Sequence, residues 1–168
     1  MDRGLLVKNA VSTVKTIKTF GVPVVHSTIN VASGRGGPTL PGLAGLLTDG
    51  KPLDRTTTSS WEDTEFLPAV HAAGRRKLIP CALWTEIRMA FTALGALRDG
   101  YEVYPVVDAI GGTSPGAHRA GLDRVMQAGA QPVSWVSLAV ELQRDWARPD
   151  TVAAIIEIVL TDRLLKEQ

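Results

Sequence analysis

The stretch IPCALWTEIRMAFTALGAL, residues 79–97, decides the fold, because it joins a short apolar strand to a helix through a tight turn. The helix has apolar residues at helical spacing, which predict one buried face: Ile87, Phe91, Leu94 and Leu97. In α/β enzymes such a turn is a common place for a nucleophile. Here the first helical turn carries Arg88, and the only cysteine, Cys81, lies seven residues earlier.

The rest of the chain alternates between helical and strand patterns. Helices are expected over 6–20, 62–73, 87–97, 113–128, 137–146 and 151–165, and strands over 23–28, 76–83, 102–109 and 132–136. This alternation predicts one domain over residues 1–168, an α/β three-layer α-β-α sandwich with a mostly parallel sheet. Residues 30–52 are rich in glycine and proline, and predict a long loop with one helical turn near 43–47.

Composition narrows the classes of function. Hydrophobic residues make up 45% of the 168-residue chain and charged residues 21%, as in globular proteins. A net charge of +1 without a basic stripe argues against nucleic acid as a partner. No apolar run reaches the ~18 residues of a membrane span, and lysines interrupt the apolar start. With a single cysteine, we expect a protein of the reducing cytoplasm, and the lack of an Asp/His cluster predicts no metal.

Several motifs resemble those of the isochorismatase-like cysteine hydrolases. They follow the family's order along nearly the whole chain: GVPVVHSTI (21–29), DRTTTSSWEDTEF (54–66), LWTEIRMAF (83–91), DAIGGTSPGAH (108–118) and ELQRDWAR (141–148). The resemblance implies hydrolysis of an amide or vinyl ether in a small-molecule substrate. It also implies a homo-oligomer that needs no cofactor.

The resemblance further implies a catalytic set of an aspartate, a cation and a cysteine whose thiol is activated by the cation and a helix N-terminus. The cation position is Arg55, and the family's cis peptide falls between Leu83 and Trp84. The backbone N–H groups of Trp84 and Arg88 would be the oxyanion donors. The nucleophile position itself is Arg88, and the strand that would carry the aspartate is not in this sequence. We therefore expect an N-terminally truncated pseudoenzyme that lacks two of three catalytic groups.

Arg88 has two interpretations, because a guanidinium stays protonated and has no lone pair for attack. It either turns the pocket into a small-anion site together with Arg55, or it extends into solvent from a site that has lost its activity. Trp84 forms a wall of the pocket, or simply packs against the helix at 87–97. Cys81 is predicted to be a small buried residue of its strand rather than a substitute nucleophile.

The first strand of the family lies in the centre of its sheet, so its loss would leave a gap beside the strand at 76–83. Pro80 agrees with a strand that is only partly paired. The sheet could close up, a partner chain could donate a strand, or the sequence could be a shortened one. Three functions stay open: an impaired hydrolase, a hydrolase that uses water held by Arg55, and a binding or assembly subunit beside an intact paralogue.

Overall fold

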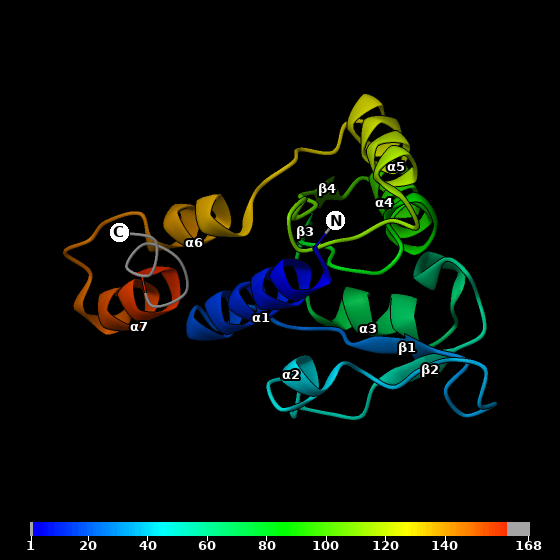
Figure 1. Ribbon diagram of the computed structural model, residues 1–168, viewed down its shortest axis with the longest axis horizontal. Coiled ribbons are helices and arrows are strands. Elements are labelled where there is room, and N and C mark those ends of the chain that lie inside the picture. Colours follow the sequence, from blue (N-terminus) through cyan, green and yellow to red (C-terminus); the bar gives the residue numbers. More distant parts are fainter. Residues whose placement is uncertain (1, 161–168) are drawn as a thin grey trace.

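The computed structural model describes residues 2–160 of the chain. Its strands form two separate parallel pairs, with helices around them (Figure 1). β1 (Ser27–Ile29) pairs with β2 (Leu53–Arg55), and β3 (Lys77–Leu78) pairs with β4 (Glu102–Val103). An isolated parallel bridge from Leu83 to Gly111 extends this second pair, and another from Val106 to Val133 joins the segment after β4 to the segment before α6.

The helices confirm the alternating pattern predicted from the sequence. They are α1 (Arg3–Thr19), α2 (Pro41–Ala44), α3 (Phe66–Ala72), α4 (Ala90–Arg98), α5 (Pro115–Gln127), α6 (Trp135–Gln143) and α7 (Pro149–Val159), with a 3-10 turn η1 (Ser60–Glu62) and a π-helical turn η2 (Thr85–Met89). A side chain caps the first turn of some of them, as in α5, where Ser114 accepts from the Ala117 amide at 3.1 Å. Glycines end several of them: Gly21 follows α1 and Gly100 follows α4, with φ of 61° and 79°.

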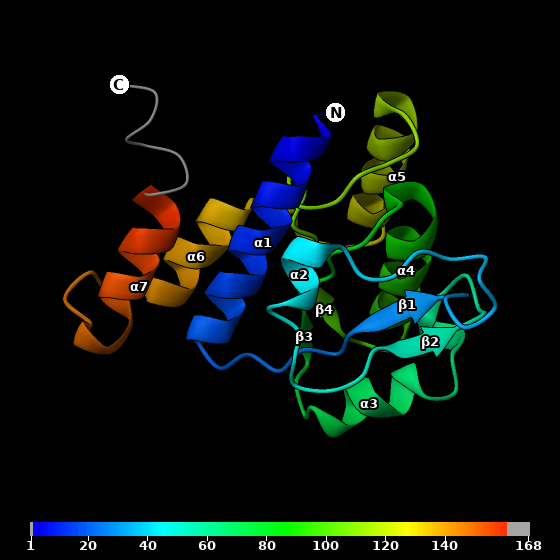
Figure 2. The ribbon, with the colours of Figure 1, turned by 60° about the horizontal axis from the view of Figure 1, so that its bottom comes forward.

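Two apolar cores lie on opposite sides of the strands, which confirms the three-layer arrangement. The first core, which includes Trp61, Met89 and Val125, is built by η1, α3, α4 and α5. The second core, which includes Trp135 and Ile155, is built by α1, α6 and α7, which lie side by side in Figure 2. Neighbouring residues of the β3 segment face opposite cores, because side chains alternate along a strand.

The buried face of the helix predicted at 87–97 differs from the expected one. Ala90, Ala93 and Ala96 are at most 1% exposed, whereas Phe91 is 36% exposed. Small side chains on this face allow a close approach to η1: a Cβ added to Gly95 would lie 2.7 Å from the Trp61 ring. Leu94 and Leu97 still pack against the first core, so the prediction is confirmed for these two residues and wrong for Phe91.

The strand predicted at 132–136 is also wrong for most of its length. Only Val133 makes a bridge, and Ser134 then caps α6 by accepting a hydrogen bond from the Ser137 amide at 3.1 Å. The amide of Trp135 donates to Asp108 Oδ1 at 2.9 Å, which adds a second acceptor at this helix start. β-branched residues on both sides of Ser134 concealed the cap in the sequence.

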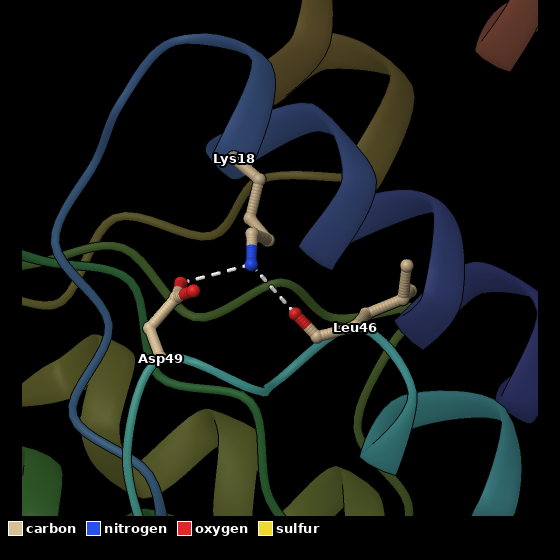
Figure 3. A network of polar contacts seen from close by, with 3 residues as sticks. All are labelled: Lys18, Leu46 and Asp49. Carbon is tan, nitrogen blue, oxygen red and sulfur yellow. Dashed lines mark hydrogen bonds and ion pairs between the residues drawn. The ribbon is translucent and has the colours of Figure 1, made fainter.

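The loop predicted over 30–52 is confirmed, with its helical turn at α2. Two carboxylates fasten this region to its surroundings. Asp54 accepts from the Thr28 hydroxyl and from the amides of Val31 and Ala32 at 2.8–3.1 Å. Lys18 of α1 binds both Asp49 and the Leu46 carbonyl at 2.8 Å, as Figure 3 shows.

The ladder between β3 and β4 ends before Pro80, as a partly paired strand requires. The carbonyls of Arg76 and Leu78 accept from Glu102 and Tyr104 at 3.0 and 2.8 Å. Pro80 has the same parity as these two residues, so its nitrogen, which has no hydrogen to donate, faces β4. The proline therefore stops pairing with β4 and does not block the opposite edge of β3.

Candidate active site

Arg55 ends β2 and is 7% exposed. Its guanidinium donates through Nη1 to the carbonyls of Thr57 and Thr58, the latter at 3.1 Å, and its Nε lies 3.5 Å from Ser27 Oγ. Within residues 2–160 no carboxylate forms an ion pair with it. Burial lowers the pKa of Arg55, the positive charge of Arg88 lowers it further, and Asp63 opposes both. An arginine nevertheless keeps its proton, so Arg55 is a buried cation without a direct counter-charge.

The turn before η2 has the backbone that the resemblance predicts. The peptide bond between Leu83 and Trp84 is cis. The carbonyl of Trp84 accepts from the amides of Ile87 and Met89, both at 3.3 Å, while the Thr85 amide donates to the Gly111 carbonyl at 2.9 Å. Trp84 is 43% exposed beside the turn.

Arg88 folds back onto this turn. Its Nη1 donates to the Leu83 carbonyl at 3.2 Å, and its guanidinium lies 5.3 Å from the centre of the Trp84 ring, a cation–π contact. The side chain is half-buried, and its charge acts on Arg55. Arg88 thus contacts Trp84 directly, and its charge reaches Arg55 on β2.

Two hydrogen-bonded pairs that the sequence analysis did not identify hold the turn against α5. Thr85 Oγ1 and His118 Nδ1 lie 2.8 Å apart, and Glu86 Oε1 accepts from the Thr113 amide and hydroxyl at 3.1 and 2.6 Å. Burial lowers the pKa of His118 below its ordinary value, although Glu86 opposes this shift. The sequence motifs TE (85–86) and GGTS (111–114) could be recognised, but no sequence pattern indicated that they contact each other.

Glu86 is an acceptor, not a proton source, at neutral pH. Burial acts to raise its pKa, but the hydrogen bonds from Thr113 and its own amide, together with the nearby His118, outweigh burial and lower the pKa overall. The carboxylate is therefore ionised, and one of its oxygens is already bound by Thr113. Its place in the structure is that of a brace for the turn.

Glycines allow the helix α5 to touch the turn directly. A Cβ added to Gly121 would lie 2.7 Å from the Glu86 Cα, and one added to Gly112 would lie 2.7 Å from the His118 amide nitrogen. At either position, the Cβ of any other residue would clash with these backbone atoms. The position of Arg88 thus depends on the absence of side chains at two sites far along the chain.

Cys81 is exposed, which corrects the prediction of a buried cysteine. It lies on the edge of the β3 segment that no other strand covers within residues 2–160. The surrounding protein still desolvates the thiol, and together with Asp108 this raises the pKa of Cys81 to about 12. A thiol with this pKa is almost fully protonated at neutral pH and is a poor nucleophile.

A separate hollow of about 440 Å³ lies beside β1 and the loop 30–52, and Arg55, Trp84 and Arg88 do not line it. His26 Nε2 and Thr39 Oγ1 approach to 2.8 Å there, and burial lowers the pKa of His26. Among the described residues, no group of His, Cys, Asp and Glu could hold a metal ion. Within residues 2–160, none of the helices has the length and apolarity that crossing a bilayer requires.

Comparison with known proteins agrees with this geometry. The model of the isochorismatase domain matches residues 3–137. The chain belongs to the isochorismatase family. It is 35% identical over 130 residues to the probable hydrolase YcaC of Escherichia coli K12, covering 77% of this chain and 62% of that protein. The chain therefore spans less than two thirds of that relative's length.

Two solved structures of YcaC proteins show the same fold. YcaC from Pseudomonas aeruginosa, with hexane-2,5-diol and covalent acrylamide, is 28% identical with a TM-score of 0.90, covering 98% of this chain and 80% of that one. The E. coli YcaC structure, described as an octameric hydrolase of unknown specificity, is 29% identical with a TM-score of 0.90, covering 98% and 79%. The turn at Leu83–Trp84 is thus part of an isochorismatase-family fold.

Proposed function

We propose that this isochorismatase-family chain has no thiol-dependent hydrolase activity and instead binds a small organic anion between Arg55 and Arg88. The observation that carries the proposal is the buried cation Arg55, which has no carboxylate partner in the described part of the chain and feels the charge of Arg88. Two neighbouring cations repel each other unless an anion lies between them. A bound anion would relieve this repulsion and accept charge-assisted hydrogen bonds.

Three side chains near the turn are poor candidates for covalent hydrolysis. Arg88 occupies the position where the resemblance expects the nucleophile, and it has no free electron pair. Cys81 has a pKa raised to about 12, so its thiolate is scarce. Glu86 is bound to Thr113 and acts as a brace.

A hydrolase that uses water held by Arg55 is the second candidate, and it needs a base beside that cation. Asp63 is the carboxylate whose charge acts on Arg55, but the two form no ion pair. The Asp63 side chain instead accepts from the amides of Glu65 and Phe66 at 3.0 and 2.8 Å. The geometry supports this function less well than anion binding.

The ligand class follows from the neighbouring surface. Trp84 offers an exposed ring, and the cations lie next to it, so an aromatic ring bearing a carboxylate matches both features. A carboxylate can accept two parallel hydrogen bonds from one guanidinium. We therefore propose an aromatic carboxylate as the preferred anion.

The test is a calorimetric titration with benzoate and with benzamide, its neutral amide. We expect benzoate to bind and benzamide to bind at least tenfold more weakly, because a hydrogen bond to a charged group contributes about 1.5–3 kcal/mol. Arg55→Ala and Arg88→Ala should each reduce benzoate affinity about tenfold or more. Arg98→Ala, which removes an exposed arginine paired with Asp99, is the matched control and should change nothing.

The same samples test the absence of thiol chemistry. Wild-type protein should release no ammonia from benzamide above background, and Cys81→Ser should not alter that result. Turnover that disappears in Cys81→Ser and survives in Arg88→Ala would refute the proposal. Equal binding of benzoate and benzamide would refute the anion site separately.

We also propose that the chain forms a homo-oligomer in a reducing compartment such as the cytoplasm. The relative from E. coli is described as octameric, and α6, α7 and their connection expose Val140, Trp146 and Ile156 at 39–51%. The single cysteine is free. Native mass spectrometry is expected to show an assembly that Trp146→Glu weakens, and a monomer at every concentration would contradict this prediction.

A further inference from the structure

Thr57 has a hydroxyl group that the fold leaves unused. Its Oγ1 is buried and has no hydrogen-bond partner among residues 2–160. A buried hydroxyl without a partner costs free energy, because it has lost its hydrogen bonds to water and gained none in the protein. Such a group calls for an explanation, and a ligand that binds to it would supply one.

The other hydroxyl groups of the same segment, TTTSS (56–60), are accounted for. Ser59 Oγ caps the η1 turn by accepting a backbone amide at 3.2 Å. Ser60 Oγ lies 2.8 Å from the hydroxyl of a threonine in α4. The threonines on either side of Thr57 are exposed, so water can reach their hydroxyls. Thr57 is thus the residue of this segment whose hydroxyl is both buried and unpaired within the described part of the chain.

The unpaired hydroxyl belongs to a residue that holds Arg55. The guanidinium of Arg55 donates through Nη1 to the carbonyls of Thr57 and Thr58, and its Nε lies 3.5 Å from Ser27 Oγ. Its Nη2 has no hydrogen-bond partner within residues 2–160. A buried cation with unpaired N–H groups and a buried hydroxyl without a partner therefore lie only two residues apart, in direct contact through the backbone.

One carboxylate can satisfy both groups. Of its two oxygens, one can accept from Arg55 Nη2 while the other accepts from the Thr57 hydroxyl. Thr57 is half-buried as a whole residue, and rotation about its χ1 angle moves Oγ1 between staggered positions while the backbone stays in place. Such a rotation can turn the hydroxyl from its buried position toward an anion bound at Arg55.

We infer that Thr57 is a ligand-contacting residue of the anion site, and that its hydroxyl donates a hydrogen bond to the bound carboxylate. The inference rests on the anion site proposed above between Arg55 and Arg88. It gives a role to a buried polar group that forms no hydrogen bond within the described fold. It also predicts effects of different kinds: removal of the hydroxyl should not destabilise the free protein, but should weaken ligand binding.

The test is Thr57→Val, which replaces the hydroxyl by a methyl group of similar size. Without ligand, its Tm should equal that of wild type or exceed it by up to about 3 °C, because no hydrogen bond within the fold is lost. Its affinity for benzoate in a calorimetric titration should be about tenfold lower, because a hydrogen bond to a charged group is lost. Thr57→Ser, which keeps a hydroxyl, should bind benzoate nearly as well as wild type.

The matched control is Thr56→Val, which removes an exposed hydroxyl from the neighbouring residue and should leave benzoate affinity unchanged. Three results would overturn the inference: wild-type affinity in Thr57→Val, an equal loss of affinity in Thr56→Val, or a Tm of Thr57→Val several degrees below that of wild type. The last result would show that the hydroxyl has a partner in the fold. If wild-type protein does not bind benzoate at all, the anion site itself is refuted, and this inference with it.

Discussion

Gly121→Ala is expected to lower the free energy of unfolding by about 2–3 kcal/mol, because the new methyl group overpacks a backbone contact. Its Cβ would lie 2.7 Å from the Glu86 Cα and 2.8 Å from the Glu86 nitrogen, where no flexible side chain can move aside. Alanine is the better helix former by about 1 kcal/mol, so the clash must exceed that gain. Urea denaturation followed by circular dichroism measures the difference.

The matched control is Gly116→Ala in the same helix. Its added Cβ would have only Ser114 Oγ nearby, at 3.9 Å, so this variant should be about 0.5–1 kcal/mol more stable. Benzoate affinity supplies a second measurement, since moving Glu86 also moves the turn that carries Arg88. Equal stabilities for Gly121→Ala and wild type would show that α5 does not press on this turn.

Trp135→Ala should have the largest effect on stability, a loss of about 3–5 kcal/mol in the free energy of unfolding. The ring is 1% exposed and forms part of the second core with Val106 and Ile155, so truncation leaves a cavity between α1, α6 and α7. Thermal denaturation measures the loss, and the variant should bind benzoate normally where it is folded, since Arg55 and Arg88 do not belong to this core.

Trp135→Phe separates ring volume from the indole N–H. The buried Nε1 of Trp135 has no hydrogen-bond partner within the described residues, so its removal forfeits no bond. We expect a loss of only about 1 kcal/mol for this variant. Trp146→Ala, which truncates a ring that is 51% exposed, should cost about 0.5 kcal/mol or less in the unassembled chain. If Trp135→Phe lost as much stability as Trp135→Ala, the loss could not be due to the volume of the ring.

Much of the fold could be predicted from the sequence because local signals determine it. Gly21 and Gly100 end helices with the positive φ that glycine tolerates, and Pro149 begins α7. The cis peptide at Leu83–Trp84 and the placement of Arg55 followed from the family resemblance. That the charges of Arg55 and Arg88 act on each other depends on the tertiary fold, but the shared family motifs already implied it.

The rest depends on contacts that no local pattern encodes. Glu86 and Thr113 are 27 residues apart, and Thr85 and His118 are 33 apart, so their pairing appears only when α5 packs on the turn. The sequence predicts that Cys81 is buried, because its neighbours along the chain are apolar. Its exposure depends on whether another strand lies beside it, which is a property of the whole sheet.

The loop 30–52 and the residues that flank it bury few side chains, which bears on local unfolding. No residue from Ile17 to Asp54 is fully buried, whereas Arg55 directly after them is. Because few of its side chains are buried, we expect this segment to open locally at a lower free energy than the two cores. Arg55 lies at the border of this segment, so we expect such a local opening to expose the buried guanidinium to ligands.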